Sequence, residues 1–128
     1  EARGLRVART RPHRPARVTL DVDQLAQVFV NVLVNAIDAA PEHSRLTLVS
    51  EILPTAWRCR LGNGGPTIPP EQLARVFEIF FSTKPGGTGI GLALCQRIVE
   101  EHGGSIDLAS SDAAGTTLTI SLPLALAP

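Results

Sequence analysis

Two asparagines one helical turn apart, Asn31 and Asn35, are the side chains of this sequence best suited to chemistry by type and spacing. Apolar residues recur around them at helical spacing, so both should lie on one face of a helix. At about 100° per residue they share a polar stripe of roughly 80° with Gln24, Gln27 and Asp38. Such a stripe needs a polar partner, and two amide oxygens suit a hydrated Mg²⁺. Hydrogen bonding of the asparagines to a neighbouring loop is the alternative.

A glycine-rich loop is the second candidate. Glycines cluster over residues 86–91, immediately before a segment with helical periodicity, and Lys84 lies just upstream. Bare backbone permits close approach to a ligand, and the free N–H groups at the start of a helix attract phosphate. The loop matches neither the GK[ST] phosphate loop nor the dinucleotide-binding loop. It predicts a phosphate contact of another kind, with an ordinary flexible turn as the alternative.

The helix that carries the asparagines has clear start and stop signals. A strand-like segment at 5–7, extended by residues 18–20, precedes it. Asp21 and Gln24 are spaced to cap the helix reciprocally, and Pro41 should end it.

The rest of the chain reads as hairpins and helices. We expect a hairpin of strands 46–53 and 57–61, followed by a glycine- and proline-rich loop at 62–70. A short helix from Pro70 and a longer helix at 92–102 should come next. A second hairpin, of strands 105–109 and 116–122, should end the domain. This order predicts an α+β fold, a two-layer α/β sandwich in which helices cover one face of a mixed, mostly antiparallel sheet.

Length and composition fit one globular domain. The 128 residues are 44% hydrophobic and 19% charged, unlike the charge-rich composition of disordered chains. Basic and acidic residues balance overall, but residues 1–17 hold six arginines against Glu1, a net charge of +5. We expect an arm or edge strand at 1–17, a domain at 18–128 and no nucleic-acid partner. A small nucleic-acid arm is the less favoured alternative.

Membrane, secretory and metal-cluster signals are absent from the sequence. No segment approaches the ~20 apolar residues of a membrane helix, and none resembles a signal peptide. The chain begins with Glu1 instead of methionine, so we expect it to be part of a longer protein. Cys59 and Cys95 are isolated from each other and from histidine, which argues against a disulfide framework or a zinc site. Both should be small buried residues.

Four segments, taken in order, resemble the motifs of the catalytic ATP-binding domain of sensor histidine kinases. This superfamily also contains the gyrase, heat-shock chaperone and mismatch-repair ATPases. Residues 27–39 resemble the N box, 77–85 the F box, 87–92 the second glycine box and 115–118 the last glycine box. The resemblance covers residues 18–123 and implies the Bergerat-type ATP-binding fold.

The resemblance implies a site for ATP and Mg²⁺. Asn35 would hold Mg²⁺ and Asn31 would help directly or through water, which makes these two the implied catalytic residues. Lys84 and the backbone of the second glycine box would cradle the triphosphate, Phe80 and Phe81 would anchor the lid, and Thr116 would lie near the adenine. The implied nucleotide-binding set is Asn31, Asn35, Asp38, Asn63, Gly65, Ile68, Phe81, Lys84, Gly87, Thr88, Gly89, Ile90, Gly91, Leu92 and Thr116.

Three positions depart from patterns known in the superfamily. In the first glycine box, a gap-free alignment puts Asn63 where the family has an aspartate that accepts from the adenine amino group, and Thr67 at a glycine. A neutral acceptor forms the weaker bond, and Thr67 adds bulk; a register with Gly62 at the aspartate is the alternative. The hydrolysing members have a glutamate where this chain has Asn31. Because an amide cannot act as a general base, this favours transfer to a histidine over attack by water.

The family's phosphoacceptor histidine is missing from this sequence. None of His13, His43 or His102 stands in a similar segment, and we expect His13 and His102 to be solvated. The implied partners are a histidine-bearing dimerisation domain of the same longer protein and a response-regulator receiver. We expect a monomeric, cytoplasmic fragment of a homodimer that could be anchored in the inner membrane. A catalytically weak module that only docks on kinase helices or a receiver is the alternative function.

Overall fold

The computed structural model describes residues 6–10, 18–79 and 91–125 of the chain. Its elements follow the order β1 (Arg6–Thr10), α1 (Val22–Ala39), β2 (Arg45–Ile52), β3 (Ala56–Asn63), α2 (Pro70–Leu73), α3 (Gly91–Glu101), β4 (Ser105–Ser111) and β5 (Gly115–Pro123). The predicted order of strands, hairpins and helices is therefore confirmed. The strand-like reading of residues 18–20 is wrong, because they form no regular structure before α1.

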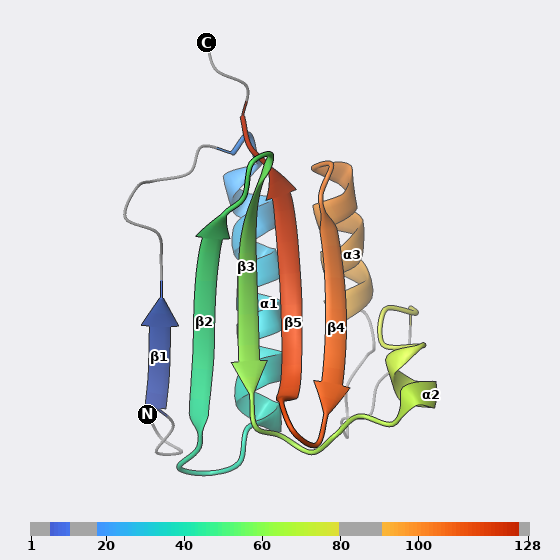
Figure 1. Cartoon of the computed structure of the whole chain (residues 1–128). Helices are drawn as coiled ribbons and strands as arrows, with labels where there is room; N and C mark the ends of the chain where they lie inside the picture. Colours follow the sequence, from blue (N-terminus) through green and yellow to red (C-terminus); the bar gives the residue numbers. More distant parts are fainter. Residues whose placement is uncertain (1–5, 11–17, 80–90, 126–128) are drawn as a thin grey trace.

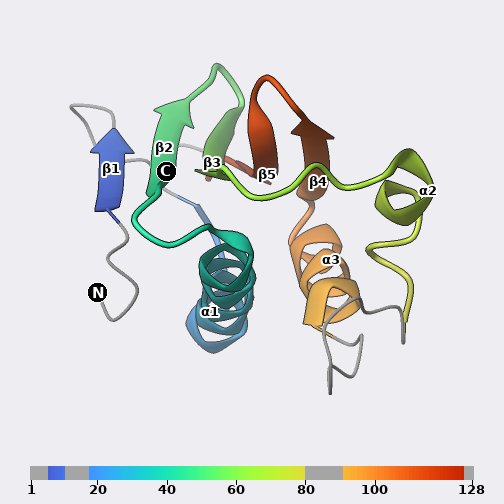
Figure 2. The ribbon, with the colours of Figure 1, turned by 90° about the horizontal axis from the view of Figure 1, so that it is seen from below.

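The strands form one sheet in the order β1-β2-β3-β5-β4 (Figure 1). β1 pairs with β2 in parallel, and the other neighbours are antiparallel. α1 and α3 lie side by side on one face of this sheet (Figure 2). The predicted two-layer α+β sandwich with a mixed, mostly antiparallel sheet is confirmed.

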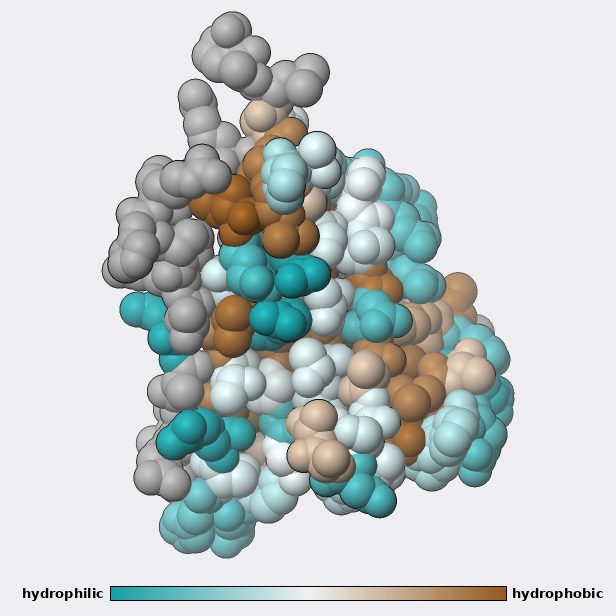
Figure 3. Space-filling view, viewed as in Figure 1, coloured by the Kyte–Doolittle hydropathy of each residue, from teal (hydrophilic) through white to brown (hydrophobic). Residues whose placement is uncertain are grey.

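The face of the sheet turned away from the helices is largely polar (Figure 3). On this face one carboxylate oxygen of Glu51 forms ion pairs with the guanidinium groups of Arg58, at 3.1 Å, and Arg60, at 2.9 Å. These ion pairs are partly exposed, so each adds little to stability. The core lies between the sheet and the helices.

Alternate residues of the strands are buried against the apolar faces of the helices. Along β5 every second residue from Thr116 to Leu122 is buried, as expected for a strand with one face on a core. The apolar core consists of Leu25, Val28, Val32, Ala36, Ala40, Leu46, Leu61, Cys95, Ile98, Val99, Ile106, Leu118, Ile120 and Leu122. Cys59 is also buried, and both cysteines are free thiols, as the sequence predicted. Burial raises the pKa of Cys59 to about 11, so this thiol is protonated at neutral pH.

Capping of α1 differs in one half from the sequence prediction. The Asp21 carboxylate accepts from the Gln24 N–H at 3.0 Å, as predicted. The Asp21 N–H is not bonded to Gln24 but donates at 2.9 Å to Nε2 of His102, the residue that follows α3. The chain therefore replaces a local capping box with a contact between two helices.

None of the helices within the described ranges is long and apolar enough to cross a membrane.

Candidate functional site

A row of polar side chains crosses three neighbouring strands at one end of the sheet. Asn63 on β3 pairs with Thr116 on β5, and Thr116 pairs with Ser110 on β4. Because side chains alternate along a strand, this row faces the helices, as does the apolar row of Leu61, Leu118 and Leu108 next to it. We call this end of the sandwich, marked by Asn63, Thr116 and Ser110, the site end.

The two long helices run antiparallel, so α1 ends and α3 begins at the site end (Figure 2). Two contacts set their register: Asp21 with His102, and Val28 with Cys95, whose Sγ lies 3.8 Å from the Val28 carbonyl oxygen. Asn31 lies about one turn beyond Val28 and is therefore roughly level with the first turn of α3. This arrangement places Asn31 beside the first turn of α3, and Asn35 one turn further toward the site end.

The predicted polar stripe of α1 is divided by its surroundings. Asn31 and Asn35 are half-buried, whereas the other members are exposed. The Asn31 side chain is hydrogen-bonded to the Cys95 thiol on α3. Burial raises the pKa of Cys95, and the bonds from Asn31 and from the Cys95 backbone oppose that rise. Asn31 thus faces the other helix, on the side where the site end opens.

The loop over residues 64–69 is shaped at its start by Asn63 and Gly65. The Asn63 amide oxygen accepts from the Gly65 N–H at 2.8 Å, which makes a local turn. A Cβ atom at Gly65 would lie 2.6 Å from the carbonyl oxygen of Ala39, the last residue of α1, and 2.7 Å from the Asn63 amide oxygen. Glycine is therefore required for the loop to approach the end of α1.

The same loop is held at its far end by Ser110 and Asp112, which the sequence did not single out. The Ile68 N–H donates to Ser110 Oγ at 2.9 Å, and Ser110 Oγ lies 2.8 Å from Thr116 Oγ1. The Thr67 hydroxyl donates to the Asp112 carboxylate in the turn after β4. Thr67 is thus directed toward that turn, which accommodates the extra bulk noted in the sequence. The signal for Ser110 is the register of the sheet, which is not a local sequence pattern.

Much of the predicted nucleotide-binding set meets at the site end. The members there are Asn31, Asn35, Asp38, Asn63, Gly65, Ile68, Gly91, Leu92 and Thr116. Thr116 is only 7% exposed, and Leu92 packs against the core. The other predicted members, Phe81, Lys84, Gly87, Thr88, Gly89 and Ile90, lie outside the described residues.

The donor set at the site end fits a hard cation with few protein ligands. No group of three His, Cys, Asp or Glu side chains that could hold a metal occurs in the part of the chain that the structure describes. Asn31 and Asn35, whose amide oxygens are neutral, are half-buried, and Asn31 lies beside the first turn of α3. Mg²⁺ is commonly held in this way, by one or two protein oxygens together with water and phosphate.

The opposite end of the sandwich is organised by His102. Its Nδ1 donates to the Ile98 carbonyl oxygen at 2.8 Å while Nε2 accepts from the Asp21 N–H. A nitrogen that accepts carries no proton, so these bonds define the neutral Nδ1–H tautomer. The expectation that His102 is merely solvated is wrong, because the half-buried ring ties α3 to the start of α1. We call this end, marked by Asp21 and His102, the closed end.

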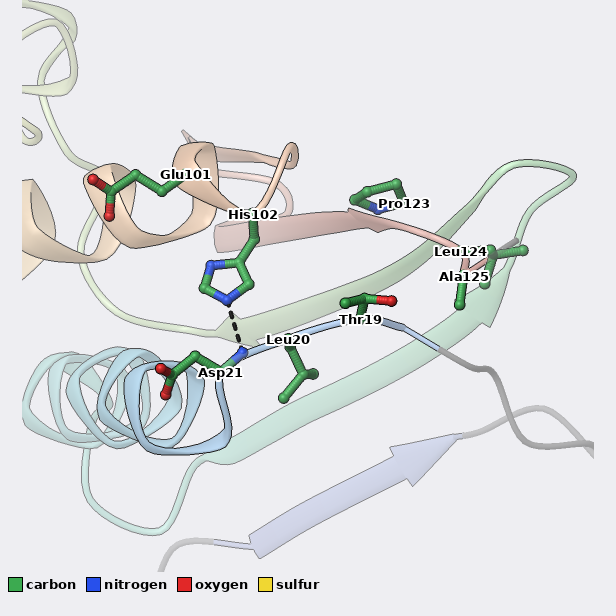
Figure 4. A pocket seen from close by; sticks show the side chains of 8 residues that line it. All are labelled: Thr19, Leu20, Asp21, Glu101, His102, Pro123, Leu124 and Ala125. Carbon is green, nitrogen blue, oxygen red and sulfur yellow. Dashed lines mark hydrogen bonds between the residues drawn. The ribbon is translucent and has the colours of Figure 1, made fainter. Parts of the chain in front are cut away.

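A shallow cavity of about 450 Å³ lies at the closed end (Figure 4). Its lining consists of Thr19, Leu20, Asp21, Glu101, His102, Pro123, Leu124 and Ala125. None of these residues belongs to the polar row, so this cavity and the candidate site are at different ends of the described structure.

Comparisons with known proteins agree with this geometry. Residues 20–126 match the family described as histidine kinase-, DNA gyrase B-, and HSP90-like ATPase. The sensor histidine kinase ZraS of Escherichia coli K12 is 36% identical over 107 residues, which cover 84% of this chain and 23% of ZraS. The chain therefore spans less than a quarter of this curated relative.

Solved histidine kinase structures share the fold. The catalytic domain of histidine kinase ThkA superposes with a TM-score of 0.86 at 32% identity, covering 95% of this chain and 82% of that one. ThkA in complex with the response regulator TrrA gives a TM-score of 0.83 at 29% identity, over 97% of this chain and 35% of that one. Full-length ShkA in complex with AMPPNP gives a TM-score of 0.85 at 25% identity, over 98% of this chain and 27% of that one.

Proposed function

Because the chain belongs to the histidine kinase-, DNA gyrase B- and HSP90-like ATPase family and is the catalytic ATPase domain of a sensor histidine kinase, we propose that its site end binds Mg²⁺–ATP. There it presents the γ-phosphate of ATP to a histidine on a separate dimerisation domain of the same longer protein. The observation that carries the proposal is the meeting of Asn35, Asn63 and Thr116, which are far apart in the sequence, at one end of the sandwich.

The polar row forms the base-binding part of the site. Asn63 and Thr116 occupy neighbouring strands beside a loop whose backbone is held close to α1. The Asn63 amide oxygen already accepts from Gly65, but a carbonyl oxygen has a second lone pair for the adenine amino group. The complex of the similar kinase ShkA with AMPPNP supports nucleotide binding by this fold.

Asn31, Asn35 and the start of α3 form the phosphate-binding part. The N–H groups of the first turn of α3 favour an anion there, and Asn31 is roughly level with them, with Asn35 one turn further toward the site end. Asn35 and, directly or through water, Asn31 would hold Mg²⁺. When bound, Mg²⁺ neutralises charge on the triphosphate.

The residue types favour transfer to histidine over hydrolysis. Asn31 carries an amide and cannot remove a proton from water. An imidazole is already a nucleophile, so transfer to it depends on positioning and charge neutralisation, which these residues supply. The acceptor histidine and a response-regulator receiver are the partners that we propose, and the ThkA–TrrA complex is an example of the second kind. We propose a cytoplasmic location for this domain.

Labelling with γ-³²P-ATP in trans tests the function. The isolated chain should incorporate no acid-labile phosphate, and labelling should appear when the histidine-bearing helices of the longer protein are added. Asn35→Ala should abolish that labelling, whereas Ser105→Ala, on the exposed side of β4, should leave it unchanged. Labelling of the isolated chain would show that one of its own histidines is an acceptor. ATP binding with no labelling of the added helices would favour an interaction module instead.

A further inference from the structure

We propose that Ser110 is a positioning residue for the nucleobase. This inference rests on the proposed function and adds to it a residue outside the motifs that suggested the site. Ser110 is in β4, the edge strand of the sheet, and does not belong to any of the four motif segments.

Ser110 joins the two parts of the base-binding region. Its Oγ accepts from the Ile68 N–H at 2.9 Å and lies 2.8 Å from Thr116 Oγ1. Burial alternates along β4, and Ser110 follows Ile106 and Leu108 onto the side that faces the helices. One hydroxyl group therefore fixes the distance between the loop backbone and the side chain on β5.

The number of donors and acceptors on the Ser110 hydroxyl gives this residue a second role, which is to orient the proton of Thr116. A serine hydroxyl has one proton and two lone pairs, and the Ile68 N–H occupies one lone pair. When Ser110 donates its proton to Thr116 Oγ1, the Thr116 proton is available for a bound ligand. Adenine presents an unprotonated ring nitrogen on its pairing edge, whereas guanine presents N–H there. A donating Thr116 would therefore favour adenine.

A neighbouring contact holds the same loop independently of Ser110. The Thr67 hydroxyl donates to Asp112, so two consecutive loop residues are tied to β4 and the turn that follows it. With Asn63 holding Gly65, the loop is fixed at both ends. Loss of the Ser110 hydroxyl should consequently misplace the base wall without unfolding the loop.

The test compares ligands with and without a base. Affinities of ATP and of inorganic tripolyphosphate, both with Mg²⁺, are measured by competition against a fluorescent ATP analogue. Ser110→Ala should weaken ATP binding by about tenfold, because the Ile68 N–H and the Thr116 hydroxyl lose a partner. Binding of tripolyphosphate, which has no base, should stay within about twofold of its original affinity. Ser110→Thr keeps the hydroxyl and should restore ATP affinity to within about threefold.

Matched variants separate positioning from general stability. Ser105→Ala removes the same group from the opposite, exposed side of β4 and should change neither affinity. If Ser110→Ala does not fold, Ser110→Cys keeps the size with a weaker hydrogen bond, and ATP affinity should fall by roughly threefold. Unchanged ATP affinity in the folded variant, or equal losses for ATP and tripolyphosphate, would overturn the role of Ser110. A parent chain that binds no ATP would instead overturn the proposed function.

Discussion

The two ends of the sandwich use hydrogen bonds in different ways. At the closed end, His102 joins one helix to another, linking the Ile98 carbonyl oxygen to the Asp21 N–H. At the site end, Ser110 and Asn63 join loop backbone to strands. The closed end fixes how α1 and α3 lie on the sheet. The site end fixes a loop beside the place where α1 ends and α3 begins.

This difference suggests that stability and ligand binding can be separated within a small domain. Substitutions at the closed end should lower the free energy of unfolding and leave nucleotide affinity unchanged. Substitutions at the site end should change nucleotide affinity and have a smaller effect on the free energy of unfolding. A matched pair of glycines, Gly104 at the closed end and Gly65 at the site end, allows a direct test.

Gly104→Ala should cause the largest loss of stability. A Cβ atom there would lie 2.1 Å from the Ser121 carbonyl oxygen, so β5 or the end of α3 must move. We expect a loss of about 3 kcal/mol in the free energy of unfolding, measured with urea, and unchanged ATP affinity in the folded protein.

Gly65→Ala is the counterpart, since its Cβ would collide with Ala39 and Asn63. It should weaken ATP binding by about tenfold with a smaller effect on stability. Equal effects of Gly104→Ala on affinity and on stability would break the separation of the two ends.

Alkaline pH should destabilise the core through Cys59. Burial raises the pKa of this thiol from 9.0 to about 11 in the folded chain, so the folded state keeps its proton where the unfolded state loses it. The resulting stability is complete below pH 9 and is lost as the pH rises toward 11, by about 2 to 3 kcal/mol. Cys59→Val, of similar volume, should show a shallower loss of unfolding free energy between pH 9 and 11. Identical slopes for the two proteins would contradict the assignment to Cys59.

His102→Ala removes the bond that ties the two helices at the closed end. Two hydrogen bonds are lost, and with net values near 1 kcal/mol each the unfolding free energy should fall by about 1 to 2 kcal/mol. That corresponds to roughly 4–8 °C in the melting temperature of a domain of this size. ATP affinity should not change.

His43→Asn is the control for His102→Ala, since His43 has a positive φ of 60° that asparagine tolerates. It should change the melting temperature little. A loss as large as that of His102→Ala would show that the link between the helices is not the cause.

Asn63→Asp should give the smallest effect. The turn to Gly65 is retained, because a carboxylate accepts the same N–H. A charge-assisted bond to the adenine amino group is stronger by ~1 kcal/mol, so ATP affinity should rise about fivefold. GTP should gain nothing, because guanine presents a carbonyl there. An unchanged ATP/GTP affinity ratio would mean that Asn63 only shapes the turn.

The sequence predicted features whose signals are local. The apolar period of α1, its Asp21 cap and the glycines after α3 predict elements from neighbouring residues, and the structure confirms them. The asparagine stripe was also visible, because helical spacing alone puts Asn31 and Asn35 on one face.

Features that depend on distant pairing were not predicted. His102 and Asp21 are 81 residues apart, and their bond replaces the expected local partner of the cap. Ser110 looks like any small polar strand residue until the register of β4 and β5 brings it beside Thr116. The parallel pairing of β1 with β2 likewise has no local signal. Such contacts arise from the arrangement of the sheet, which no single segment encodes.

The most direct test of the account is titration of the ¹⁵N-labelled chain with ATP, with and without Mg²⁺. Binding should be tighter with Mg²⁺, and amide signals at the site end, including Asn35, Gly65 and Thr116, should shift. Signals of Asp21 and His102 at the closed end should stay in place. Absence of binding, or shifts centred on the cavity beside His102, would contradict the assignment of the nucleotide to the polar row.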